Sequence, residues 1–179
     1  MITPEADEEL LIVELYDIHS YELIRYIYML VNDELQSEDL LQETFIRAWK
    51  NVHRMKEIEN SRAWLFKIAH NASMDYLRKK KPIHLIEKFI KSVPDPSLQP
   101  EKYIQTMEES RELIDRINNL KDRYRKIILL RKVHEFSIRE TADILKWSES
   151  KVKTTLHRAM KSLEDSYIRA EEVYYEKKS

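Results

Sequence analysis

Glycine is absent from the 179 residues of this chain. Because glycine has no side chain, it supplies most easily the positive φ angles of tight β-turns and β-bulges. A chain without it is poorly suited to a β-sheet fold, and its abundant Leu, Ile, Glu, Lys and Arg are good helix formers. The composition therefore predicts an all-α protein.

The available side chains exclude several kinds of chemistry. The chain has no Cys, which rules out disulfides, thiolate catalysis and zinc sites built on cysteine. Its 6 His are scattered along the sequence, without the spacing of metal ligands. There is no glycine-rich phosphate loop and no nucleophile paired with a base. We therefore expect a protein that is not an enzyme, with no catalytic residues, no cofactor and no metal.

Nothing in the sequence indicates insertion into a membrane. No apolar run reaches the length of a membrane span. The first residues, MITPEADEELL, are acidic, whereas a signal peptide begins with basic and then apolar residues. We therefore expect a cytoplasmic protein.

Charge is distributed unevenly, although the formal net charge is only −1. Arg25 is the single Lys or Arg before Arg47, among acidic residues that recur from Glu5 to Glu43. From Arg47 to Lys81 the balance reverses. Separate acidic and basic surfaces can bind a protein partner and phosphates, respectively, although solvated helix faces are the simpler alternative.

Apolar residues recur at helical spacing in three segments of the first half. They predict helices over residues 8–31, 37–52 and 62–80. Ser37 is placed to cap the second helix, and Asn60 or Ser61 to cap the third. Pro82 is expected to end the third helix, because proline lacks the amide donor that a helix interior uses.

The most specific local pattern lies between residues 136 and 163. Ser137 and Glu140 have the S-x-x-E spacing of a capping box, which starts a short helix. Ser148 can cap a second helix after a brief turn, which lacks the glycine often found there. Two short helices joined in this way form a helix-turn-helix, whose second helix can enter the DNA major groove.

The second helix of this motif carries polar and basic residues on its outward side. Such side chains can contact phosphates, guanine edges or thymine methyl groups. We predict DNA contacts by Lys151, Lys153, Thr154, His157, Arg158 and Lys161. The alternative is an ordinary helix pair in a bundle with a solvated basic face.

Prolines mark a boundary between two domains. Four of the 5 Pro fall between residues 82 and 100, which disfavours a long helix there. We predict two small helical domains, an N-terminal helical bundle and a C-terminal helix-turn-helix domain, joined by a proline-containing linker. The predicted ranges are 1–81 for the first domain, 82–104 for the linker, 105–168 for the second domain and 169–179 for a C-terminal tail.

Three stretches resemble the extracytoplasmic-function sigma factors of bacterial RNA polymerase, which are members of the sigma-70 family. Residues 37–49, SEDLLQETFIRAW, are similar to the polymerase-binding helix of that family. Residues 64–80 are similar to its W-L-x-R-I-A-x-N…D-x-x-R stretch, and residues 152–159 to its helix-turn-helix. The matches occur in the family's order and cover most of the chain except the linker and the tail.

The resemblance implies an initiation factor that binds core RNA polymerase and directs it to promoters. By this resemblance, the first domain corresponds to sigma region 2 and the second domain to sigma region 4. Docking on the polymerase is implied for Asp39, Leu40, Gln42, Glu43 and Phe45. Recognition of the melted strand of the -10 element is implied for Arg62, Trp64, Lys67, Asn71, Arg78, Lys79 and Lys80. The helix-turn-helix residues named above are expected to read the duplex -35 element.

The resemblance also implies a membrane-anchored anti-sigma factor as a further partner. Two rival functions use the same sequence features. A free-standing helix-turn-helix regulator would bind a palindrome as a dimer, without polymerase. A helical adaptor would present basic faces that never touch DNA.

Overall fold

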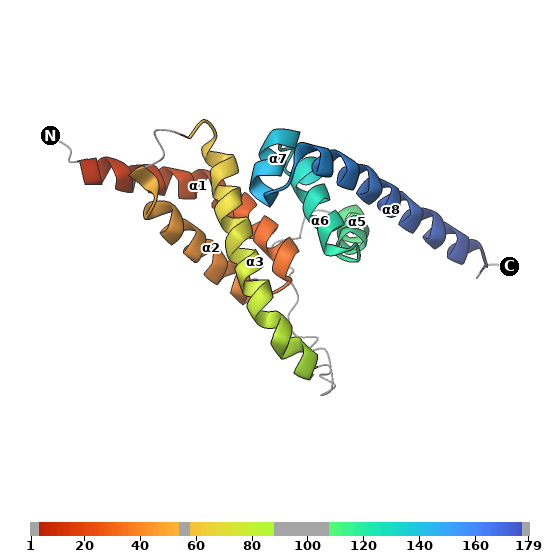
Figure 1. Cartoon of the computed structure of the whole chain (residues 1–179). Coiled ribbons are helices and arrows are strands. Elements are labelled where there is room, and N and C mark those ends of the chain that lie inside the picture. Colours follow the sequence, from red (N-terminus) through yellow and green to blue (C-terminus); the bar gives the residue numbers. More distant parts are fainter. Residues whose placement is uncertain (1–3, 54–57, 88–107, 177–179) are drawn as a thin grey trace. The chain divides into compact units, whose positions relative to one another are not determined.

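The computed structural model describes residues 4–53, 58–87 and 108–176 (Figure 1). All regular secondary structure in these ranges is helical, which confirms the all-α prediction. The chain forms two compact units, Met1–Tyr103 and Ile104–Ser179. Within the described ranges, no helix combines the length and the hydropathy of a membrane span.

In the first unit, the described residues form three α-helices. They are α1 (Pro4–Val31), α2 (Glu34–Trp49) and α3 (Ser61–Glu87). Each pair of these helices is in contact, so their apolar stripes meet in one core. Within it, the Tyr26 and Phe66 rings lie 5.0 Å apart, and the Tyr26 hydroxyl is hydrogen-bonded to Nδ1 of buried His70 at 2.9 Å. Burial raises the pKa of Tyr26 above its ordinary value. The hydrogen bond between Tyr26 and His70 connects α1 with α3.

The junction between α1 and α2 is made by two adjacent residues. Asn32 takes the left-handed conformation at φ 53°, and its N–H donates to the Tyr28 carbonyl at 2.8 Å, which closes α1. Asp33 then caps α2, because its carboxylate accepts from the Gln36 N–H at 3.1 Å. The prediction that Ser37 caps this helix is therefore wrong. Ser37 lies inside α2, almost fully buried, and its hydroxyl donates to the Asp33 carbonyl.

The third helix begins as predicted and ends later. The Asn60 side chain accepts from the Ala63 N–H at 3.0 Å, so Asn60 is the cap. The prediction that Pro82 ends the helix is wrong, because α3 continues through it to Glu87. A proline removes only its own amide donor, and a helix can continue past it at the cost of one hydrogen bond and a local distortion. Most of the predicted linker lies outside the described residues.

The second unit is built around its last and longest helix. Its elements are α5 (Glu108–Asn118), α6 (Asp122–Ile128), the π-helical turn η2 (Leu129–Val133), α7 (Ile138–Leu145) and α8 (Glu149–Glu176). The last of these packs against α5, α6 and α7, and it extends through much of the predicted tail. The fully buried side chains include Ile127, Leu130, Phe136, Ile144 and Val152. The two α-helices of the predicted helix-turn-helix therefore share one core with α6.

Candidate nucleic-acid and partner interfaces

The start of α7 has the predicted capping box. The Glu140 N–H donates to the Ser137 hydroxyl at 3.1 Å, and the Ser137 N–H donates to the Glu140 carboxylate at 2.7 Å. Both bonds satisfy amide donors that a helix N-terminus leaves without a partner inside the helix. The first helix of the motif therefore has a fixed starting point.

The turn after α7 is closed by a residue other than glycine. Lys146 takes the left-handed conformation at φ 55° and ψ 45°. Its N–H donates to the Asp143 carbonyl at 3.3 Å, and the Trp147 N–H donates to the Ala142 carbonyl at 2.9 Å. This pair of bonds is a Schellman motif, in which a residue with positive φ ends the helix. The sharp reversal into α8 therefore depends on a lysine in a backbone conformation that glycine favours.

The beginning of α8 orders the side chains that follow it. The Ser148 hydroxyl accepts from the Lys151 N–H at 3.2 Å, as predicted for a cap. The Nζ atom of Lys151 lies 4.3 Å from the centre of the Trp147 ring, which is a cation–π contact. The cap and the ring together hold Lys151 at the end of the helix where a base or a phosphate would approach.

The predicted DNA-contacting residues share one exposed side of α8. Val152 and Ala159 lie fully buried beneath this side, so the register of the helix is fixed by the core. The exposed residues are Lys151, Lys153, Thr154, His157, Arg158 and Lys161. The structure thus brings all six together, and we call them the recognition face.

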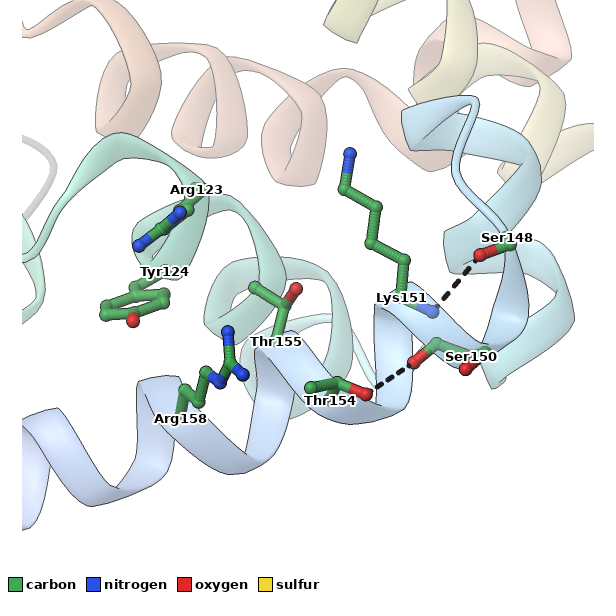
Figure 2. A pocket seen from close by; sticks show the side chains of 8 residues that line it. All are labelled: Arg123, Tyr124, Ser148, Ser150, Lys151, Thr154, Thr155 and Arg158. Carbon is green, nitrogen blue, oxygen red and sulfur yellow. Dashed lines mark hydrogen bonds between the residues drawn. The ribbon is translucent and has the colours of Figure 1, made fainter.

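A cleft of about 380 Å³ borders the recognition face (Figure 2). It is lined by Arg123, Tyr124, Ser148, Ser150, Lys151, Thr154, Thr155 and Arg158. Arg123 and Tyr124 come from α6, outside the helix-turn-helix. Arg123 was not predicted from the sequence, because its proximity to α8 depends on how the helices cross.

On α2 the five residues expected to dock on the polymerase divide into two groups. Asp39 and Gln42 are exposed, and Glu43 is half-buried with a carboxylate that accepts from Arg47 at 2.5 and 3.0 Å. Leu40 and Phe45, in contrast, lie in the core at 2% and 7% exposure. They hold α2 in place and do not present a contact surface.

Three large apolar side chains of α2 face solvent beside the acidic residues. They are Leu35, Ile46 and Trp49, with exposed fractions of 72%, 51% and 59%. Their exposure was not predicted from the sequence, in which Trp49 occurs at helical spacing with the apolar residues of this helix. Together with Asp39 and Gln42 they recur at alternating steps of four and three residues, which is the spacing of a coiled-coil seam. We call these five residues the α2 seam.

Arg62, expected at the -10 element, bridges two helices of its own unit. Its Nε and Nη2 atoms donate to the Glu22 carboxylate at 3.0 and 2.8 Å, and its guanidinium lies over the Phe66 ring. Partial burial raises the pKa of Glu22, but Arg62 and His19 outweigh it, and the pKa lies below its ordinary value. The pair therefore stabilises the contact of α1 with α3.

The other residues expected at the -10 element follow α3 for several turns. Trp64, Lys67 and Asn71 are half-buried. Arg78 bonds to Asp75, while Lys79 is exposed. Lys80 lies over the Tyr76 ring and 3.7 Å from Asp33. The hydrogen bond with Tyr76 and the charge of Asp33 outweigh partial burial and raise the pKa of Lys80. The charged form of Lys80 is thus favoured.

Comparison with known proteins assigns both units. The model of Sigma-70 region 2 matches residues 15–83, and the model of Sigma-70 region 4 matches residues 110–163. The ECF RNA polymerase sigma factor SigX of Bacillus subtilis is 35% identical over 154 residues, which cover 83% of this chain and 79% of SigX. The sigma factor YlaC of the same organism is 31% identical over 90% of this chain and 94% of YlaC.

A solved structure has the same fold. The sigma factor RpoE of Bartonella quintana, in complex with the anti-sigma factor NepR, superposes with a TM-score of 0.67 at 22% identity, over 85% of this chain and 93% of RpoE. The identity to SigX and the match of both regions establish the family of this chain. It belongs to the extracytoplasmic-function sigma factors of the sigma-70 family, non-enzymatic DNA-binding proteins that direct the initiation of transcription by RNA polymerase.

Proposed function

We propose that the two units divide the work of promoter recognition. Residues 1–81 bind core polymerase and the melted -10 strand in the cytoplasm, where the polymerase is. Residues 105–168 read the duplex -35 element through the recognition face. A proline-containing linker, predicted as residues 82–104, joins them, and its first residues belong to α3, which ends at Glu87. Residues 169–179 are the predicted tail, into which α8 continues as far as Glu176.

The recognition face is the observation that carries this proposal. Its six exposed side chains lie opposite buried Val152 and Ala159, on a helix with a fixed cap and a fixed turn. A rigid helix that presents cations, hydroxyls and an imidazole outward suits the major groove. Lys153, Thr154 and His157 have the side chains to reach base edges, while Lys151, Arg158 and Lys161 suit phosphates.

The α2 seam supports a polymerase-binding role for the first unit. Exposed Leu35, Ile46 and Trp49 can pack against apolar positions of a partner coiled coil. Asp39 and Gln42 lie between them, and Glu43 lies beside them, where acids and an amide can pair with basic partner residues and set the register. Leu40 and Phe45 contribute from the core by holding the helix.

The -10 strand is proposed to follow α3. The amide of Asn71 can pair with a flipped base, and the Trp64 ring can stack on one. Positive charge along the same helix makes this contact sensitive to salt, and it comes from Arg62, Lys67, Arg78, Lys79 and Lys80.

The RpoE structure contains an anti-sigma factor. We propose that an anti-sigma factor, in this case anchored in a membrane, inhibits this chain as well.

Reconstituted holoenzyme tests the assignment of the recognition face. Promoters are first selected from a random library by the full-length chain bound to core polymerase. The double variant Lys153→Ala/His157→Ala should then lose binding to the selected -35 duplex, because each base contact contributes about 1–3 kcal/mol of discrimination. Lys132→Ala, an exposed change on η2, is the matched control. Binding of selected DNA by the chain alone, as a dimer on a palindrome, would refute the division of labour.

A further inference from the structure

We infer that the cleft between α6 and α8 binds one backbone phosphate of the -35 duplex, held between Arg123 and Arg158. This inference rests on the proposed -35 contact and adds to it a binding site outside the helix-turn-helix. Figure 2 shows Arg123 and Tyr124 projecting from α6 on one side of the cleft, with Arg158 rising from α8 on the other. Two guanidinium groups on opposite walls can hold a tetrahedral anion from two directions.

The lining of the cleft has the chemistry of a phosphate site. Of the 8 described residues that line it, three are cationic, four carry aliphatic hydroxyls, one is a tyrosine, and none is acidic. The acids next to lining residues in the sequence are Asp122, which is bonded to Arg125 at 3.1 Å, and exposed Glu149, and neither lines the cleft. The Arg123 guanidinium lies over the Tyr124 ring, 5.0 Å from the ring centre. The lining of the cleft therefore concentrates positive charge and hydroxyl groups and contains no carboxylate.

The position of the cleft on α8 matches a phosphate at the edge of the major groove. Lys151, Thr154, Thr155 and Arg158 recur at helical spacing and line it along one flank of the helix. Lys153 and His157 lie on the side of α8 away from that flank, where base edges would be read. A helix in the groove is flanked by the sugar-phosphate backbones, so a cleft on its flank meets a phosphate when the opposite side meets bases.

A phosphate in this cleft has a consequence that separates it from base recognition. Neutralising one phosphate releases condensed counterions, and the slope of log affinity against log salt changes by about 0.9 for each contact in duplex DNA. The loss of Arg123 should therefore weaken binding equally on all -35 sequences. It should also reduce the salt dependence, whereas the loss of a base contact changes sequence preference.

The test compares Arg123→Gln and Arg158→Gln with Lys132→Gln in full-length holoenzyme on a library-selected promoter. Lys132 is an exposed cation of the same unit that does not line the cleft. Between 50 and 200 mM salt, the affinity ratio of wild type to Arg123→Gln should shrink by up to about 3.5-fold, the effect of losing one whole phosphate contact, since Arg158 remains. Circular dichroism and thermal melting show whether each variant is folded.

Methylphosphonate substitution then locates the contact. Promoters carrying one uncharged linkage at each -35 position should include one position at which wild type and Lys132→Gln lose affinity while Arg123→Gln and Arg158→Gln each lose clearly less, because each retains only one of the two arginines that hold the phosphate. If no linkage shows this behaviour, or if Arg123→Gln matches Lys132→Gln throughout, the inference is overturned although -35 binding stands. If wild-type holoenzyme does not protect a -35 duplex at all, the proposed function fails as well.

Discussion

Replacing Lys146 by glycine should stabilise the second unit. Lys146 ends α7 at φ 55°, in a conformation where the Cβ atom of an L-residue crowds the backbone. The two backbone bonds of the Schellman motif involve no side chain, so glycine can keep them. The only structural changes are the removal of the strained Cβ and of an exposed side chain.

The size of the gain follows from two opposing effects. The left-handed conformation costs an ordinary residue about 1–2 kcal/mol. Glycine also gives the unfolded chain more freedom, which takes back about 0.4–1 kcal/mol. A net stabilisation of about 0.5–1 kcal/mol is therefore expected, which corresponds to a two- to fivefold increase in the equilibrium constant for folding at about 1.4 kcal/mol per factor of ten.

Hydrogen exchange of the full-length chain measures this gain in the right unit. The slowest amides of α7 and α8 exchange through global unfolding of their unit. Their protection factors should therefore rise two- to fivefold in Lys146→Gly. Amides of α1 to α3 serve as an internal reference. Lys146→Ala is the matched control, because it removes the same side chain but keeps the Cβ. Equal protection in the glycine and alanine variants would refute the strain argument.

Three further predictions concern the first unit. Glu22→Gln should lower the free energy of unfolding by about 1–2 kcal/mol at pH 7. Because the pKa of Glu22 is lowered in the folded state, the difference in unfolding free energy between wild type and variant should disappear as pH falls through that pKa. Urea titrations at a series of pH values measure it, and exposed Glu14→Gln should have little effect at any pH. Tyr26→Phe removes the 2.9 Å bond to His70 and should cost about 1 kcal/mol by the same titration; an unchanged midpoint would show that the bond contributes nothing. Trp49→Ala should weaken binding to core polymerase at least tenfold without lowering Tm, whereas Val13→Ala, an exposed apolar change outside the α2 seam, should leave binding unaltered.

Local signals in the sequence were sufficient where a feature depends on neighbouring residues. The Ser137–Glu140 capping box and the Ser148 cap involve groups three residues apart, and both are present in the structure. The Ser37 cap failed for a related reason. Asp33 offers a stronger acceptor one turn earlier, and the sequence pattern did not rank the two candidates.

Features that depend on packing between helices could not be derived from periodicity. Trp49 occupies an apolar position of α2, but the helix is rotated so that Ala48 enters the core and Trp49 does not. A role at the -10 element was implied for Arg62 by the family resemblance, but its bond with Glu22 joins residues 40 positions apart, which no local pattern indicates. Arg123 approaches α8 only because α6 crosses it.

The cations of the two units differ in a way that bears on how the promoter is engaged. In the first unit Arg62, Arg78 and Lys80 are paired with Glu22, Asp75 and Asp33. Phosphates must compete with these carboxylates, which lowers the gain from each contact. On the recognition face Lys151, Lys153, Arg158 and Lys161 form no ion pair with any residue that the structure describes. These cations can therefore contact the -35 duplex without first breaking an ion pair within the protein. In the first unit such ion pairs must be broken, and the effective concentration created when the polymerase holds both units on one DNA can offset that cost.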